Sequence, residues 1–128
     1  MHLRLMCLAL ALAASSAARG GQSKDPAERA FQFCYSCHSV DPAEEGLPGP
    51  TLFGVIGRPI AAVPGLKYSK ALKDFAATNR VWTPALIERF MERAPEMAPG
   101  TLMEPPPGMD KPENRKLILE YLARTKAK

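Results

Sequence analysis

The stretch CYSCHSV, residues 34–40, places two cysteines and a histidine within five positions. Cys37 and His38 follow Cys34 by three and four positions, so a helix through this stretch would present all three side chains on one face. C-x-x-C-H is the attachment pattern of c-type haem, in which two thiols bond to vinyl groups along one haem edge and the imidazole reaches the iron. The stretch therefore predicts one haem c, bound covalently through Cys34 and Cys37.

Three other kinds of site could use these side chains. A structural zinc site needs four ligands, usually from two separated clusters, and the sequence after residue 18 contains no other Cys or His. A thioredoxin-like redox pair follows a strand in a βαβ unit, and no strand pattern precedes Cys34. A plain disulfide between Cys34 and Cys37 stays possible, although it would leave His38 without a role. Haem is the interpretation that uses all three residues.

Residues 1–18 are predicted to be a secretory signal peptide. Arg4 precedes an apolar run over residues 5–14, which is too short to anchor in a bilayer, and small residues suited to a signal peptidase follow it. Cleavage near Ala18 would remove His2 and Cys7 and leave residues 19–128 as one small domain. This kind of export predicts the bacterial periplasm. We expect no stable membrane insertion, because no later segment approaches about 20 apolar residues.

The charge balance argues against nucleic acid as a partner. The chain has 17 Lys and Arg residues and 13 Asp and Glu residues, and one of the basic residues, Arg4, lies in the predicted signal peptide. No block of Lys or Arg stands out. The small basic excess therefore indicates an ordinary protein surface.

Four helices and no strands are expected, which makes the predicted fold all-α. The first helix should run over residues 26–37 with Asp25 as its N-cap. A second, short helix is expected within residues 68–79, and a third should begin after Thr83 and stop at Pro95. The last lies within residues 110–126, where Asp110 and Glu113 can cap it. Residues 39–67 and 95–109 are rich in Pro and Gly, and we expect such long loops to wrap a group other than protein.

A haem iron held by His38 needs a second axial ligand. Because no other His follows residue 18, a methionine thioether is the natural soft donor. The candidates are Met91, Met97, Met103 and Met109. Met91 lies on the apolar face of the third expected helix, so core packing is its better interpretation. The other three lie in the proline-rich loop, where each could be a ligand or could simply fill a gap in the interior.

Further stretches resemble class I cytochrome c in that family's order. They are CYSCH at 34–38, GPTLFGVIGR at 49–58, PGLKYSKAL at 64–72, the segment around Trp82, PGTLM at 99–103 and LILEYL at 117–122. The resemblance covers nearly all of residues 19–128. It implies about four helices with long loops wrapped around one haem, and a periplasmic one-electron carrier rather than an enzyme.

The resemblance also implies specific site residues. Met103 would be the second axial ligand, and the carbonyl oxygen of Pro50 would accept the Nδ1 hydrogen of His38. Three residues match positions that hold the haem propionates in the family: Arg58, Tyr68 and Trp82. Where many members place a Tyr near the ligand sulfur, this chain offers Phe90 or Met91, neither of which can donate that hydrogen bond.

The expected partners are redox proteins: a dehydrogenase, a reductase or a terminal oxidase. Family members that shuttle to an oxidase often ring the exposed haem edge with lysines. The matching positions here are Phe33, Leu47, Glu96 and Leu102. An apolar edge of this kind favours a dedicated partner, so an alternative function is the electron-accepting haem subunit of a periplasmic dehydrogenase complex.

A third possibility is a five-coordinate iron that senses small ligands or acts as a peroxidase. A peroxidase would need an acid–base group on the open side of the iron, and no second His is present there to act as one.

Overall fold

The structure is a computed structural model that describes residues 23–125. The predicted signal peptide, residues 1–18, lies outside the described residues. The helices in chain order are α1 (Pro26–Phe31), the 3-10 helix η1 (Cys34–Ser36), α2 (Lys70–Thr78), α3 (Pro84–Met97) and α4 (Pro112–Arg124). Between residues 23 and 125 the only β-type pairing is an isolated antiparallel bridge of Pro59 with Val81. The all-α prediction is confirmed.

The first helix is shorter than expected. Asp25 caps it as predicted, with its side chain accepting a hydrogen bond from the Ala27 N–H at 3.0 Å. However, α1 ends at Phe31, and after a short turn the chain tightens into η1. The prediction that one helix carries Cys34, Cys37 and His38 on a single face is therefore wrong. A tight turn brings them together instead.

Helix α2 lies within residues 68–79, as predicted. The Ser69 hydroxyl accepts from the Leu72 N–H at 3.2 Å, which satisfies one of the free donors at the helix start. Phe75 is the buried residue of this helix.

Helix α3 is capped by Thr83 as expected, but it does not stop at Pro95. It continues to Met97 across a kink, where Arg93 adopts the non-helical angles φ −141° and ψ 37°. Proline has no N–H, and its ring clashes with the carbonyl group four residues earlier, so the backbone bends ahead of Pro95 and then resumes. The kink therefore separates a long first part of α3 from a short second part.

The start of α4 also differs from the prediction. Neither Asp110 nor Glu113 caps the helix: the N-cap position is Lys111, and it makes no side-chain capping bond. Pro112 opens the helix, and Glu113 lies in its first turn, where a negative charge is favourable near the helix N-terminus.

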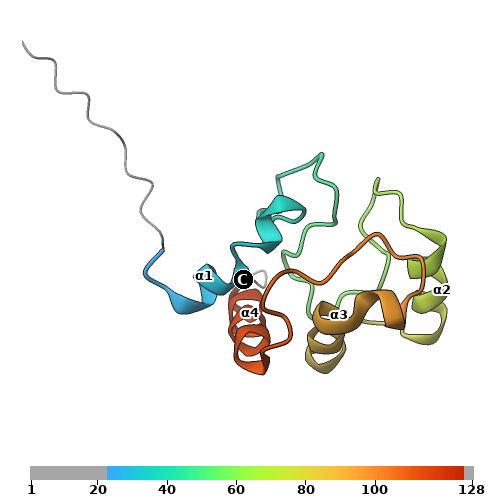
Figure 1. Ribbon diagram of the computed structural model, residues 1–128. Helices are drawn as coiled ribbons and strands as arrows, with labels where there is room; N and C mark the ends of the chain where they lie inside the picture. The colour runs from blue at the N-terminus through green and yellow to red at the C-terminus, as the bar shows by residue number, and fades with distance from the viewer. Residues whose placement is uncertain (1–22, 126–128) are drawn as a thin grey trace, which may run out of the picture.

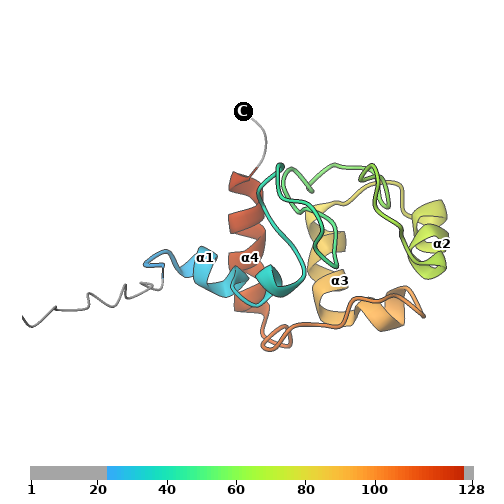
Figure 2. The same ribbon diagram turned by 90° about the horizontal axis from the view of Figure 1, so that it is seen from above.

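The helices surround an interior that long loops cross. Figures 1 and 2 show α1 beside α4 at one end of the molecule, α2 at the other end and α3 between them. Phe31 of α1 and Ile118 of α4 are fully buried, and they join the two helices. A second apolar cluster forms around Phe75 and Phe90, and Trp82 packs against both clusters. None of the helices within residues 23–125 is long and apolar enough to cross a membrane.

Candidate haem-binding site

A cavity of about 680 Å³ lies between η1, the loops and helices α2, α3 and α4. Its size falls in the range of cofactor pockets, roughly 300–1,000 Å³. Most of its lining is apolar and comes from residues such as Leu52, Val55, Ile87, Ile118 and Leu122. All eight residues proposed from the sequence line it: Cys34, Cys37, His38, Pro50, Arg58, Tyr68, Trp82 and Met103.

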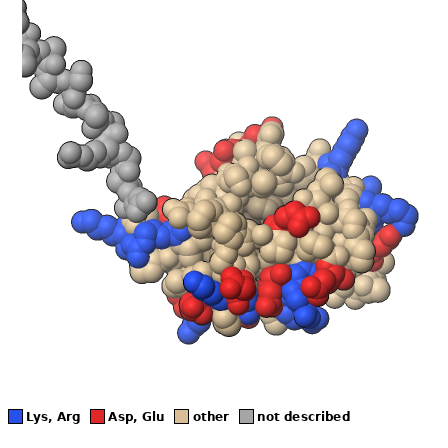
Figure 3. Space-filling view, viewed as in Figure 1, with Lys and Arg blue, Asp and Glu red and all other residues tan. Residues whose placement is uncertain are grey.

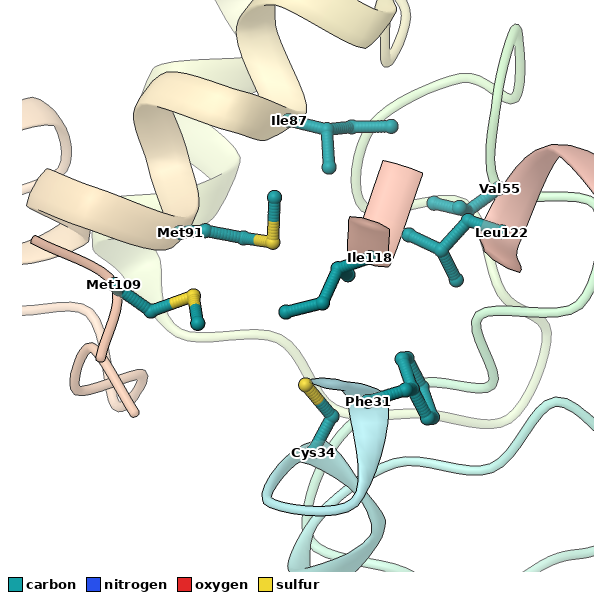
Figure 4. Packing of buried hydrophobic residues seen from close by; sticks show 8 residues of the cluster. All are labelled: Phe31, Cys34, Val55, Ile87, Met91, Met109, Ile118 and Leu122. Carbon is teal, nitrogen blue, oxygen red and sulfur yellow. The ribbon is translucent and has the colours of Figure 1, made fainter. Parts of the chain in front are cut away.

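The two cysteines lie at different depths. Cys34 is 9% exposed, and burial raises the pKa of its thiol to about 11, whereas Cys37 is exposed. Figure 4 shows the Cys34 side chain pointing into the same interior space as Ile118 and Met91. The amide groups of Cys37 and His38 both donate to the Cys34 carbonyl oxygen, at 3.1 Å and 2.8 Å. This turn fixes one thiol inside the cavity and one at its entrance.

His38 is held in one orientation by the segment that follows it. Its Nδ1 lies 2.7 Å from the carbonyl oxygen of Pro50. A carbonyl oxygen can only accept, so Nδ1 carries the hydrogen and Nε2 keeps a free lone pair. Burial lowers the pKa of His38, which favours the neutral imidazole that binds metals.

Gly49 supports this arrangement and was not singled out from the sequence. Its N–H donates to the Cys37 carbonyl oxygen at 2.7 Å. A Cβ atom at this position would lie 2.5 Å from His38 Cε1, 2.7 Å from Nδ1 and 2.8 Å from the Cys37 oxygen. No side chain fits there, so the glycine is needed for the close approach of the loop to the imidazole. The Gly-Pro pair in GPTLFGVIGR was the available signal.

The four methionines occupy different places. Met97, expected in the proline-rich loop, is instead the last residue of α3, and it is half-buried and does not line the cavity. Met103 is half-buried and lines the cavity from the loop that follows α3. Met91 is buried on α3 and also lines the cavity, while Met109 is buried in the apolar cluster with Ile118. Among residues 95–109, Met103 is the methionine that reaches the cavity wall.

Arg58 brings a positive charge to the cavity wall. Its guanidinium group donates to the carbonyl oxygens of Thr51 at 2.7 Å and Phe53 at 3.1 Å. Burial lowers the pKa of this group, but an arginine stays charged. The two backbone contacts leave further N–H groups of the fork available to a ligand.

Tyr68 and Trp82 line the cavity together with Arg58. The Tyr68 hydroxyl accepts a hydrogen bond from the Val63 N–H at 3.1 Å, so its own hydrogen can be donated elsewhere. The Trp82 ring packs edge-on against Phe90 with ring centres 5.1 Å apart. These residues add two neutral donors near the charged group.

Arg115 is a second residue that sequence reasoning missed. It is buried on α4, and its Nη1 donates to the Met109 carbonyl oxygen at 2.6 Å. It also lies 3.5 Å from the carboxylates of Glu88 and Glu92 on α3. Arg115 thus ties the end of the Met103 loop to two helices. Its surroundings come from other elements, so no local signal in the sequence marks it.

The chain is similar to known proteins over most of its length. No protein-family model matches it. Cytochrome c2 of Rhodomicrobium vannielii is 32% identical over 115 residues, which are 90% of this chain and 87% of that protein. This chain belongs to the class I cytochromes c. Cytochrome c2 of Rhodopila globiformis is 35% identical over 105 residues, or 80% of this chain and 94% of that protein.

Solved structures agree with this cytochrome c assignment. Cytochrome c2 from Rhodospirillum centenum superposes with a TM-score of 0.67 at 28% identity, covering 79% of this chain and 96% of that one. Cytochrome cH from Methylobacterium extorquens superposes with a TM-score of 0.66 at 31% identity, covering 77% of this chain and 94% of that one. The cytochrome c fold is confirmed, and with it one haem c attached through the pair Cys34 and Cys37.

The cavity fits that haem by its size, its apolar lining and its donors. A haem attached through Cys34 and Cys37 would fill this space and bring apolar contacts to its lining, and so would complete the interior between the helices and the loops.

Proposed function

We propose that this cytochrome c is a one-electron carrier of the bacterial periplasm whose haem iron is bound by His38 and Met103. Its family supports electron transport as the function and no enzymatic activity. The observation that most supports the axial pair is the single cavity that gathers Cys34, Cys37, His38 and Met103. When bound, the haem supplies the one-electron chemistry of its iron.

His38 contributes an imidazole that is already oriented for binding. Its Nδ1 hydrogen bond to Pro50 fixes the tautomer, and its lowered pKa keeps Nε2 free of a proton at neutral pH. The thioether of Met103 is a soft donor, which favours ferrous iron and raises the reduction potential. Phe90 and Met91, both buried beside the cavity, cannot donate a hydrogen bond to this sulfur.

Arg58, Tyr68 and Trp82 are proposed to hold the propionates. Buried carboxylates need charged or hydrogen-bonding partners, and these three lining residues offer a guanidinium fork, a phenol and an indole N–H. Arg58 keeps its place through Thr51 and Phe53, so its position does not depend on a ligand.

The periplasmic location rests on the predicted signal peptide at residues 1–18. Export and haem attachment there would leave residues 19–128 as the mature cytochrome c domain.

The test of this proposal is a redox titration of the haem-loaded protein with a set of methionine variants. Met103→Ala should abolish the weak charge-transfer band of methionine-bound ferric haem, at the red end of the visible spectrum, and lower the potential. Met97→Ala serves as the matched control, because Met97 does not line the cavity. Loss of the band in Met97→Ala but not in Met103→Ala would refute the assignment.

One observation favours a second candidate function, the haem subunit of a periplasmic dehydrogenase complex. Phe33 and Leu102 line the cavity and yet are 51% and 86% exposed, so a large apolar area faces solvent beside the haem site. Co-purification of a stable heterodimer at high salt would support this function. A monomer that exchanges electrons with many partners, at rates that depend steeply on salt, would support the free carrier.

A further inference from the structure

The charged side chains around the cavity are unevenly placed. Three Lys, Arg or Glu side chains line it, two of them positive and one negative: Arg58, Lys67 and Glu104. Arg58 and Lys67 belong to the segment that leads to Tyr68. Glu104 instead lies between Leu102 and the prolines 105–107, which also line the cavity, and it is exposed. The side that bears the proposed ligand loop thus carries a negative charge.

Part of the cavity lining is apolar and exposed. Leu102 is 86% exposed and Phe33 is 51% exposed, and both line the cavity together with the exposed Cys37. We call the surface formed by Phe33, Cys37, Leu102, Glu104 and Pro105–Pro107 the cavity mouth. Because Cys37 is one of the haem attachment points, the mouth is where electrons can pass over a short distance.

Further acidic residues lie in the loop that follows His38. Asp41, Glu44 and Glu45 are exposed on the loop that joins His38 to Pro48, and both ends of that loop line the cavity. Within residues 23–125 the structure records no ion pair for these three residues or for Glu104. Figure 3 shows Lys and Arg at the α1 end and at the α2 end, Lys, Arg, Asp and Glu mixed along the lower edge, and a mostly uncharged region between them in which the charges visible are Asp or Glu.

We propose that the cavity mouth is the docking surface for a redox protein whose matching surface is apolar and edged by Lys or Arg. The proposal rests on the proposed function as an electron carrier, and it specifies the partner's chemistry. A dry contact over Phe33 and Leu102 would bury Glu104 close to the interface. An unpaired carboxylate there would lose its hydration without compensation, so a partner with a cation opposite Glu104 is favoured.

The experiment measures the electrostatic field at the mouth with two small outer-sphere oxidants. The ferrous, haem-loaded protein is mixed with tris(phenanthroline)cobalt(III), charge 3+, or with hexacyanoferrate(III), charge 3−, in a stopped-flow instrument at low salt. The ratio of the two rate constants cancels any change in haem potential that affects both reactions alike. We expect Glu104→Lys to lower the cation-to-anion ratio by about tenfold, and Glu104→Gln by about threefold, because the charge changes by two units and one.

The matched control is Glu120→Lys, which changes the net charge of the protein by the same two units. Glu120 is exposed on α4, two positions from both Ile118 and Leu122, which line the cavity, so it lies on the opposite side of the helix. A smaller change for Glu120→Lys than for Glu104→Lys supports the proposal. Equal changes in both variants would overturn it.

Two further outcomes bear on the result. If the wild-type protein forms a dimer in sedimentation and Leu102→Lys makes it monomeric, the mouth binds a second copy of this chain, and the proposed partner is wrong. If the haem-loaded protein reacts with neither oxidant, the proposed electron-carrier function fails. Reaction with both oxidants and no response to Glu104 would leave that function intact and refute only the docking surface.

Discussion

Replacing Gly49 with alanine should disturb the imidazole of His38. The added Cβ would lie 2.5 Å from Cε1 and 2.7 Å from Nδ1 of His38. Ordinary carbon contacts are about 3.5–4.0 Å, so the ring or the loop must move by roughly 1 Å. Such a shift stretches the 2.7 Å hydrogen bond from Nδ1 to Pro50. Because the φ angle of Gly49 is not positive, backbone strain adds nothing to this contact.

The expected cost is the sum of two effects. Forcing an extra carbon into a packed interior costs about 1–3 kcal/mol, and loss of one hydrogen bond costs about 0.5–1.5 kcal/mol. The free energy of unfolding should therefore fall by about 1.5–4.5 kcal/mol. Guanidinium unfolding of the haem-loaded protein, followed by its Soret absorbance, measures this change. The electron paramagnetic resonance spectrum of the ferric protein should shift too, because it reports the geometry of the axial ligands.

Gly46→Ala is the control, in the same loop. Gly46 has φ +80°, and a Cβ added to it would meet no atom within 4 Å, so alanine there costs stability through the backbone alone. Its resonance spectrum should match the wild type. The reasoning is refuted if Gly49→Ala leaves both the unfolding curve and the resonance spectrum unchanged.

The packing and the charges lead to three more predictions. Met109→Ala should lower the free energy of unfolding by about 2–5 kcal/mol, because Met109 is buried. It should keep the charge-transfer band that Met103→Ala is expected to lose. Unfolding curves measure the loss of stability, and visible spectroscopy measures the band. Arg115→Met should cost about 1–3 kcal/mol in guanidinium unfolding, since the Met109 carbonyl group loses its donor. Arg124→Met removes an exposed ion pair with Asp25 and an exposed contact with the Tyr121 ring, and it should cost less. His38 should make the free energy of unfolding depend on pH. Because the pKa of His38 is lowered in the folded state, the unfolded chain binds a proton that the folded chain does not. The free energy of unfolding should therefore fall as the pH drops below about 6.5, by up to about 1.4 kcal/mol per pH unit. Unfolding midpoints that stay constant from pH 7 to pH 5 would contradict the last prediction.

The parts of the fold that sequence alone could predict depend on local chemistry. Asp25 and Thr83 each precede a helix as predicted, and the caps at these positions act through the next two or three residues. The C-x-x-C-H spacing is equally local, and it led directly to the haem. Such features need no knowledge of what packs against them.

The features that were missed depend on contacts between distant segments. The apolar spacing continues past Phe31 to Cys34, so nothing in the sequence marks the change from α1 to η1. Gly49 is required because it meets a ring eleven positions earlier. Arg115 is buried because Glu88, Glu92 and the Met109 carbonyl group surround it, and each comes from another part of the chain.

The central claim is that a covalently attached haem completes an interior that the polypeptide leaves open. The most direct measurement compares exported wild-type protein with the Cys34→Ala, Cys37→Ala double variant, using intact mass after denaturation and near-ultraviolet circular dichroism. The wild type should be red, carry the mass of one haem and show fixed aromatic signals, while the double variant should lack haem and lose those signals. A colourless double variant that keeps the wild-type near-ultraviolet spectrum and a cooperative unfolding transition would contradict the claim.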